Sequence, residues 1–409
     1  MSAFKTSEDI IDFSIGAPGK KLLEQAHQLF QKSSEKFNEK CDDAHFQYGA
    51  NRGSPEFLDN LAEFLSSEYQ DHVTSDRLLL TSGATQGLHL IASTQLNMKE
   101  GVVFVENPTY FLALDILAND VGLKVVGMDH ELSNVESLIV ENKPKKTDFN
   151  TKDEKYWGMM YLIPTYHNPT GGCLDDQKIE YLLKMAEKHN FLIVCDDVYN
   201  LLYYDVECPK RMLHNFKNSP NLISNGSFSK IYCPGLRLGW IEATPRTLLE
   251  ISEGGILRSG GAVNNVMSGI LACSMRDGSL RKHVQSLRFE YGQRMKKLCN
   301  YLEENLPPDF KFQKPHGGYF IWVLGPSGFN ATKFFQLCTN EKFKILVGER
   351  ASSFRNSECA KLKCLNAIRL SIAFYEEEDL IKGAERLCQA LRKFIGSEVA
   401  CSESLLVEK

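Results

Sequence analysis

Long apolar runs and basic blocks are missing from this 409-residue sequence. No stretch comes near the roughly 20 consecutive apolar residues that a membrane-spanning helix needs. The 47 lysines and arginines are outnumbered by 52 aspartates and glutamates, so the net charge is −5. We therefore expect a protein that binds neither a membrane nor nucleic acid.

Paired cysteine motifs and targeting signals are missing as well. The 12 cysteines include no CxxC pair, and Cys359 and Cys364 have no second pair with which to complete a zinc site. We expect free thiols in a reducing compartment and no bound metal. The first residues lack an apolar signal core and the last four match no retention or peroxisomal signal, which predicts a cytoplasmic location.

The length is enough for one large hydrophobic core and one smaller core, in a composition that is ordinary for an α/β enzyme. We expect an N-terminal segment and helix at 1–45 and a large domain at 46–290. A small C-terminal domain is predicted at 291–395, closed by a helix over Glu376–Ile395. The polar tail at 396–409 is predicted to be disordered.

A lysine near the middle of the chain has unusual neighbours. Lys230 follows a short buried strand, stands beside Ser227 and Ser229, and precedes a Pro-Gly turn and Arg237. Burial there would disfavour the ammonium form and favour the free amine. A free amine condenses with aldehydes, which is how a lysine anchors pyridoxal phosphate (PLP). The nearby hydroxyls and the guanidinium suit the phosphate of such a cofactor.

Two further segments fit the same ligand. The strand Arg77–Thr81 and the turn Ser82–Gln86 lead into a helix, and the first amides of a helix form an anion site. The continuous apolar strand Phe191–Cys195 predicts a parallel sheet covered on both faces, and it ends at Asp196 and Asp197. A carboxylate at that strand end needs a positive charge, which a protonated pyridine nitrogen supplies.

Several motifs in one order resemble a known family: Asn168–Gly171 (NPTG), a D-x-x-Y spacing at Asp196 and Tyr199, Ser227–Lys230 (SFSK) and Pro234–Trp240 (PGLRLGW). From about Phe13 to about Leu391 the chain is similar to the PLP-dependent aminotransferases of fold type I, class I/II. Within that family it most resembles the aminoadipate/kynurenine and broad-range transaminases. The resemblance implies a large α/β domain, whose mostly parallel sheet is flanked by helices, and a smaller α+β C-terminal domain. It also implies a homodimer.

The resemblance further implies transamination between an L-amino acid (2-aminoadipate, aromatic or aliphatic) and a 2-oxo acid. Lys230, Asp196 and Tyr199 would be the catalytic residues, and the family's spacing selects Asp196 over Asp197. The other cofactor-binding residues would be Ala84, Thr85, Tyr110, Asn168, Ser227, Arg237 and, from the neighbouring subunit, Tyr48. The substrate would be bound by Gly16, Asn168 and Arg369.

Each of these residues also has a structural interpretation. Gly16 fits a connector, Asn168 a turn, and Tyr48 or Tyr110 an interface or core position, while Arg369 could pair with Glu376 or Glu377. The motifs fix a cofactor but not which bond breaks, so a PLP-dependent lyase or decarboxylase, a PLP-binding regulator and an inactive structural protein remain alternatives. The loops Gly254–Ala262 and Gly348–Phe354 have no role that the sequence identifies.

Overall fold

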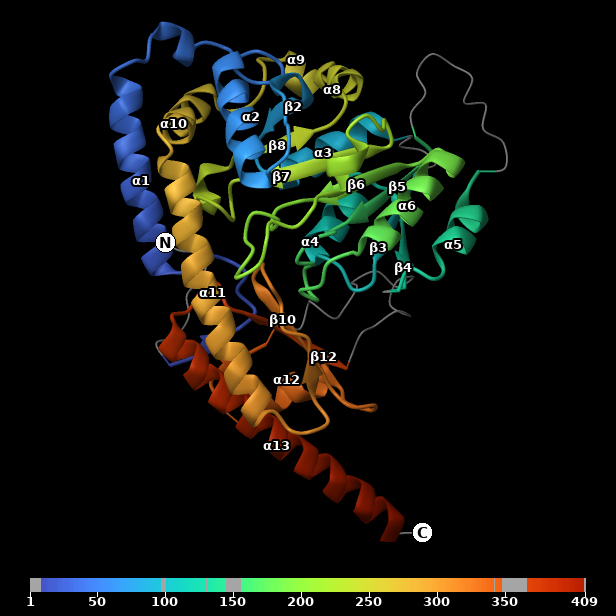
Figure 1. Cartoon of the computed structure of the whole chain (residues 1–409). Helices are drawn as coiled ribbons and strands as arrows, with labels where there is room; N and C mark the ends of the chain where they lie inside the picture. Colours follow the sequence, from blue (N-terminus) through green and yellow to red (C-terminus); the bar gives the residue numbers. More distant parts are fainter. Residues whose placement is uncertain are drawn as a thin grey trace.

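A seven-stranded sheet forms the centre of the structure, a computed structural model that describes residues 9–96, 101–129, 131–144, 156–341, 343–347 and 366–407 (Figure 1). The strands lie in the order β2-β8-β7-β6-β5-β3-β4. All pairings are parallel except those of β8, which runs antiparallel to both β2 and β7. Their bounds are β2 Leu78–Thr81, β3 Val102–Glu106, β4 Lys124–Met128, β5 Gly158–Leu162, β6 Leu192–Asp196, β7 Leu222–Ser227 and β8 Gly239–Glu242.

Both faces of this sheet are covered, because its central strands are buried along their whole length. One face packs on α5 (Val135–Asn142), α6 (Asp176–His189) and α7 (Met212–Phe216). The other face packs on a core that includes α2 (Pro55–Tyr69), α3 (Ala84–Gln95), α8 (Pro245–Ser252) and α10 (Asn265–Arg276). Successive side chains of a strand point to opposite faces, so the central strands β3, β5, β6 and β7 contribute to both cores. The continuous apolar pattern correctly predicted this mostly parallel, two-sided sheet.

A smaller antiparallel sheet lies beside the C-terminal helices, in the order β12 (Ala367–Ser371), β10 (Phe320–Leu324) and β9 (Lys311–Phe312). The long helix α11 (Ser279–Asn305) runs from the large sheet towards this part of the chain (Figure 1). A parallel pair, β1 (Ile11–Asp12) and β11 (Ile345–Leu346), ties the N-terminal segment to the same region. The remaining helices are α1 Lys20–Asn38, η1 Asp43–Phe46, η2 Ser75–Arg77, α4 Phe111–Leu114, η3 Asp115–Asp120, η4 Pro234–Leu236, α9 Gly255–Arg258 and α12 Ala331–Asn340.

The last helix differs from the prediction. Helix α13 runs from Glu377 to Val407, past the expected end at Ile395 and through most of the segment predicted to be a disordered tail. Gly396 alone costs a helix only about 1 kcal/mol relative to alanine, and strong helix formers follow it. The predicted domain boundaries themselves stay a prediction.

Among the described residues, no helix combines the length and apolar character needed to cross a bilayer.

Candidate active site

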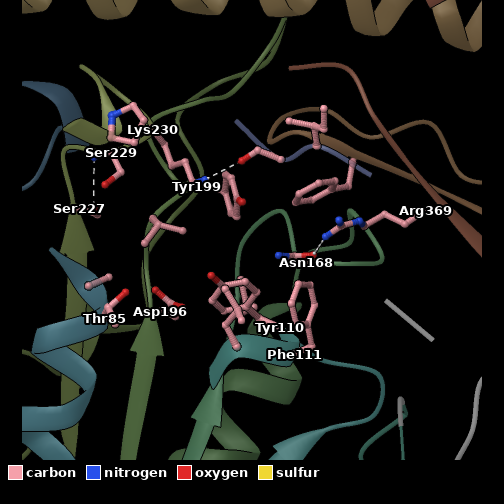
Figure 2. Close-up of a pocket in the computed structure, with 18 of the residues that line it drawn as sticks. Thr85, Tyr110, Phe111, Asn168, Asp196, Tyr199, Ser227, Ser229, Lys230 and Arg369 are labelled. Atoms are coloured by element: carbon pink, nitrogen blue, oxygen red, sulfur yellow. Dashed lines mark hydrogen bonds between the residues drawn. The ribbon is translucent and has the colours of Figure 1, made fainter. Parts of the chain in front are cut away.

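A cavity of about 630 Å³ opens at the carboxyl ends of the parallel strands, where ligands of such sheets gather. The start of α3, the small sheet and the N-terminal segment complete its walls. Figure 2 shows labelled side chains from the strand ends, the start of α3 and the small sheet converging on this space. Eleven of the twelve residues predicted for the site line the cavity: Gly16, Ala84, Thr85, Tyr110, Asn168, Asp196, Tyr199, Ser227, Lys230, Arg237 and Arg369.

Lys230 enters the cavity from the turn that follows β7 (Figure 2). Its Nζ donates a hydrogen bond to the carbonyl of Gly16 at 3.0 Å. The same nitrogen lies 5.2 Å from the ring centroid of Tyr319 and 5.7 Å from that of Tyr199. Burial lowers the pKa of Lys230 from 10.5 to about 8, although the charge of Asp196 opposes the shift. A large fraction of this amine is therefore unprotonated slightly above neutral pH, as its sequence surroundings predicted.

The two acids at the end of β6 face opposite ways. Asp196 lines the cavity, and its Oδ2 accepts a hydrogen bond of 2.5 Å from the hydroxyl of Tyr161. Asp197 accepts a hydrogen bond from Ser224 and does not line the cavity. Strand alternation explains the difference, since neighbouring residues project to opposite faces of a sheet. Burial raises the pKa of both carboxyl groups from 3.8 to about 6.

The start of α3 forms one end of the cavity. Gly83 precedes the helix with a φ of 82°, a conformation that favours glycine, and a Cβ there would lie 3.3 Å from an Arg237 guanidinium nitrogen. Asn225 of β7 donates to the carbonyl of Ala84 at 2.9 Å and so fixes this helix end to the sheet. Ala84 and Thr85 are therefore held beside the guanidinium and the hydroxyl of Ser227, an arrangement suited to an anion.

At another wall of the cavity, Arg369 projects from β12 and is only 5% exposed. Its Nη1 donates to Oδ1 of Asn168 at 2.7 Å (Figure 2). Its Nη2 donates to the carbonyl of Ser14 at 2.8 Å. The acids considered as alternative partners bind elsewhere, because Glu376 pairs with Arg294 and Glu377 with Lys297. Burial lowers the pKa of Arg369 to about 10, so the guanidinium is charged at neutral pH.

Two phenol rings line the same cavity. Tyr110 stands directly before α4, and burial raises its pKa to about 12. Tyr199 is buried and makes edge contacts with the rings of Tyr319 and Phe320, and burial raises its pKa as well. Both phenols therefore keep their protons at neutral pH and can donate hydrogen bonds.

Tyr48 is the predicted site residue that does not line the cavity. Its side chain is 82% exposed and lies over Gly260, within the loop Gly254–Ala262. That loop contacts the segment around Tyr48 also through its backbone, since the amide of Gly49 donates to the carbonyl of Gly260 at 3.1 Å. The other loop without a predicted role, Gly348–Phe354, lies outside the described residues.

Sequence reasoning missed two functional candidates that the fold brings to the site. Tyr161 of β5 holds Asp196, and Ser14 offers its carbonyl to Arg369. A signal existed for Tyr161, since a tyrosine inside a buried strand needs a partner for its hydroxyl. No signal existed for Ser14, because the contact depends on how the N-terminal segment crosses β12.

The residues of the cavity fit PLP in three respects. Oδ1 of Asp196 is buried and has no hydrogen-bond partner among the described residues, so it can accept a bond from a protonated pyridine nitrogen. The α3 start, Ser227 and Arg237 suit a phosphate, and the amine of Lys230 suits an aldehyde. An acid, an amine and an anion site in one cavity match the three reactive parts of this cofactor.

Comparisons with known proteins agree with this geometry. The family described as "Aminotransferase class I and II" matches residues 8–387. Aromatic-amino-acid aminotransferase 1 of Thermococcus litoralis is 28% identical, covering 95% of this chain and 89% of its own length. The 2-aminoadipate transaminase of Thermus thermophilus is 25% identical, covering 94% and 90%.

A solved structure extends the agreement to the whole fold. The kynurenine aminotransferase of Pyrococcus horikoshii, solved in complex with PMP, superimposes with a TM-score of 0.81 at 26% identity. The match covers 95% of this chain and 92% of that one. The predicted fold class, cofactor and reaction type are thereby confirmed. The chain belongs to the class I and II aminotransferases and is a PLP-dependent enzyme of fold type I.

Proposed function

We propose that the residues of this cavity divide the work of amino-group transfer between an L-amino acid and a 2-oxo acid. Lys230 holds the cofactor covalently through its amine. Asp196 binds the ring nitrogen through Oδ1, while Ala84, Thr85, Ser227 and Arg237 bind the phosphate. The single observation that carries this assignment is that three groups converge on one cavity: an amine whose pKa is lowered by burial, a carboxylate oxygen without a hydrogen-bond partner among the described residues, and a buried guanidinium.

Asn168, Tyr110 and Tyr199 orient the cofactor ring in this proposal. The Tyr199 hydroxyl and the side-chain amide of Asn168 donate hydrogen bonds to the ring oxygen. Tyr110 packs its flat ring against the flat cofactor. When bound, the cofactor draws electrons away from the substrate Cα, which is the chemistry that no side chain of this protein supplies.

Lys230 then moves the proton. The substrate amino group would first take the place of the Lys230 amine on the cofactor, and the freed amine would then accept the proton from the substrate Cα and return it on the cofactor side. A pKa of about 8 suits both steps, because the amine can gain and lose a proton near neutral pH. The Gly16 carbonyl, 3.0 Å from Nζ, keeps the amine directed into the cavity.

Arg369 and Asn168 select the α-carboxylate of the substrate. A planar guanidinium can bind a carboxylate through two parallel hydrogen bonds, and burial strengthens those bonds. Gly16 packs closely against this part of the site, since a Cβ there would lie 3.0 Å from the ring of Phe320, which contacts Arg369. The substrate would therefore be held by its carboxylate on one side and by its amino group on the other.

The substrate side chain is proposed to be aromatic or aliphatic. The described lining of the cavity includes the apolar residues Ile15, Phe111, Phe320, Phe335 and Leu346, and the ring of Phe320 lies against the Arg369 guanidinium. Such a wall favours an apolar side chain over the second carboxylate of 2-aminoadipate, because burying an unpaired charge is costly.

A half-reaction screen tests both the assignment and the substrate class. Purified holoenzyme is mixed with single amino acids while the cofactor absorbance is followed. We expect phenylalanine, tyrosine or leucine to convert the cofactor faster than 2-aminoadipate does. Faster conversion by 2-aminoadipate would contradict the proposal. Product analysis with and without a 2-oxo acid then separates the reaction types, since a lyase or decarboxylase turns over without the acceptor.

We also propose that the chain acts as a homodimer in which Tyr48 reaches the phosphate of the neighbour's cofactor. Tyr48 and Phe46 are 82% and 70% exposed on the same short segment, which is unusual for large aromatic side chains. Sedimentation velocity should give a dimer. The Tyr48→Phe variant should bind the cofactor more weakly while remaining a dimer. A fully active monomer would contradict this assignment. The cytoplasmic location stays a prediction from the sequence.

A further inference from the structure

The two oxygens of the Asp196 carboxylate have different surroundings. Oδ2 accepts a 2.5 Å hydrogen bond from the hydroxyl of Tyr161, whereas Oδ1 has no partner among the described residues. The residue is only 7% exposed, so water has little access to either oxygen. The orientation of the carboxylate thus depends on a single hydroxyl group.

Tyr161 is built to hold that position. It lies on β5, the parallel neighbour of β6, and pairs in register with Val194, two residues before Asp196. Residues 161, 194 and 196 therefore project to the same face of the sheet. The Tyr161 side chain is fully buried in the core on that face, and burial raises its pKa far above 10, so the hydroxyl always carries its proton.

Few charges offset the cost of burying Asp196. Burial is the largest cause and raises the pKa of Asp196 to about 6. The hydrogen bond from Tyr161 and the charge of Lys230 lower this pKa, whereas the charge of Asp197 raises it. The ionisable groups that interact electrostatically with Asp196 include Tyr161 from β5, Lys230 from the turn after β7, and Tyr110 and Tyr199 across the cavity, together with its chain neighbours Cys195 and Asp197, which project to the opposite face of the sheet. Among these groups, Tyr161 is the hydrogen-bond donor to the carboxylate.

We propose that Tyr161 is a positioning residue: its hydroxyl fixes Oδ2 of Asp196 so that Oδ1 faces the ring nitrogen of the cofactor, and it favours the ionised carboxylate. This inference rests on the proposed role of Asp196. Tyr161 acts through the carboxylate and performs no proton transfer of its own. Loss of its hydroxyl leaves Asp196 free to rotate and easier to protonate.

The test compares Tyr161→Phe with a matched control, Tyr204→Phe. Tyr204 is also buried, and its hydroxyl donates a 2.7 Å hydrogen bond to the carbonyl of Gly318, away from Asp196. Both variants keep the aromatic ring and lose one buried hydroxyl, so thermal unfolding should report similar stability losses. Any effect seen only in Tyr161→Phe can then be attributed to the lost hydrogen bond to Asp196.

Three readouts are informative. In the cofactor-free full chain labelled with ¹³C at aspartate carboxyl groups, the Asp196 signal should titrate about one pH unit higher in Tyr161→Phe than in wild type. In the holoenzyme, the affinity for PLP should fall about tenfold near pH 7. The acid limb of the half-reaction rate should also move to higher pH, because the carboxylate is lost at a higher pH. Tyr204→Phe should change none of the three.

The Asp196→Asn variant separates failure of this inference from failure of the proposed function. It also identifies the ¹³C carboxyl resonance of Asp196, because that resonance is missing from its spectrum. If Asp196→Asn retains the wild-type rate and affinity, the proposed role of Asp196 is wrong. If Asp196→Asn loses both while Tyr161→Phe matches wild type in titration, affinity and pH profile, only the role of Tyr161 is overturned. A shift of equal size in Tyr204→Phe would likewise overturn it, because the effect would then be structural.

Discussion

Replacement of Arg369 should abolish the recognition of the substrate carboxylate. The guanidinium is buried, lies 4.2 Å from the centroid of the Phe320 ring, and donates only to the neutral oxygens of Asn168 and Ser14 among the described residues. Arg369→Lys keeps the charge but loses the planar pair of donors, and Arg369→Gln loses the charge as well. A lysine is not a conservative replacement at a site of this kind.

The expected size follows from the burial of the site. Removal of one partner of a buried, hydrogen-bonded charge pair costs about 2–5 kcal/mol, which corresponds to a loss of about 30- to 5,000-fold in kcat/KM. Arg369→Lys should lie near the lower end of that range and Arg369→Gln near the upper end. Because the carboxylate is held both before and during the reaction, much of the loss should come from a higher KM.

The assay compares phenylalanine with phenethylamine, which has the same ring but no carboxylate. Wild-type enzyme should prefer the amino acid strongly, and both variants should lose most of that preference. Arg294→Lys is the matched control, because Arg294 is also buried but binds Glu376 and the carbonyl of Ala373. A preference that survives in Arg369→Gln, or that disappears in Arg294→Lys as well, would refute the reasoning.

Three further predictions follow from the same geometry. Lys230→Ala should lose turnover and the absorbance band of the lysine-bound cofactor, and a variant that keeps both would contradict its role. Ser227→Ala should weaken PLP binding about tenfold in an absorbance titration, because a hydrogen bond to a charged phosphate is lost, and unchanged affinity would contradict that contact. The raised pKa values of Asp196 and Asp197, about 6 against 3.8, stabilise the cofactor-free fold most below about pH 4, and this contribution is lost as pH rises through 6. Asp197→Asn should therefore make the free energy of unfolding less dependent on pH in urea denaturation between pH 4 and 7, and an unchanged slope would count against the buried acid.

Local sequence patterns placed parts of the candidate site at strand ends, and the roles of those residues stay a prediction. Lys230, Asp196 and the start of α3 each follow a strand whose apolar pattern is visible in the sequence, so their place at one edge of the sheet could be inferred. Strand alternation also agrees with the choice of Asp196 over Asp197, which the sequence alone took from the family spacing.

Contacts between distant segments could not be predicted in the same way. The bonds from Tyr161 to Asp196 and from Arg369 to Ser14 depend on strand register and on the path of the N-terminal segment. The length of α13 was also missed, since a polar composition does not distinguish a helix from a disordered tail. The side chains that decide substrate preference come from several elements, and no single motif contains them.

Borohydride reduction followed by peptide mass spectrometry tests the central claim most directly. Reduction fixes the cofactor permanently on the lysine that carries it, and proteolysis then identifies that residue. The account predicts one modified peptide, with the added mass on Lys230. Modification of a different lysine, or no modification in protein saturated with PLP, would contradict it.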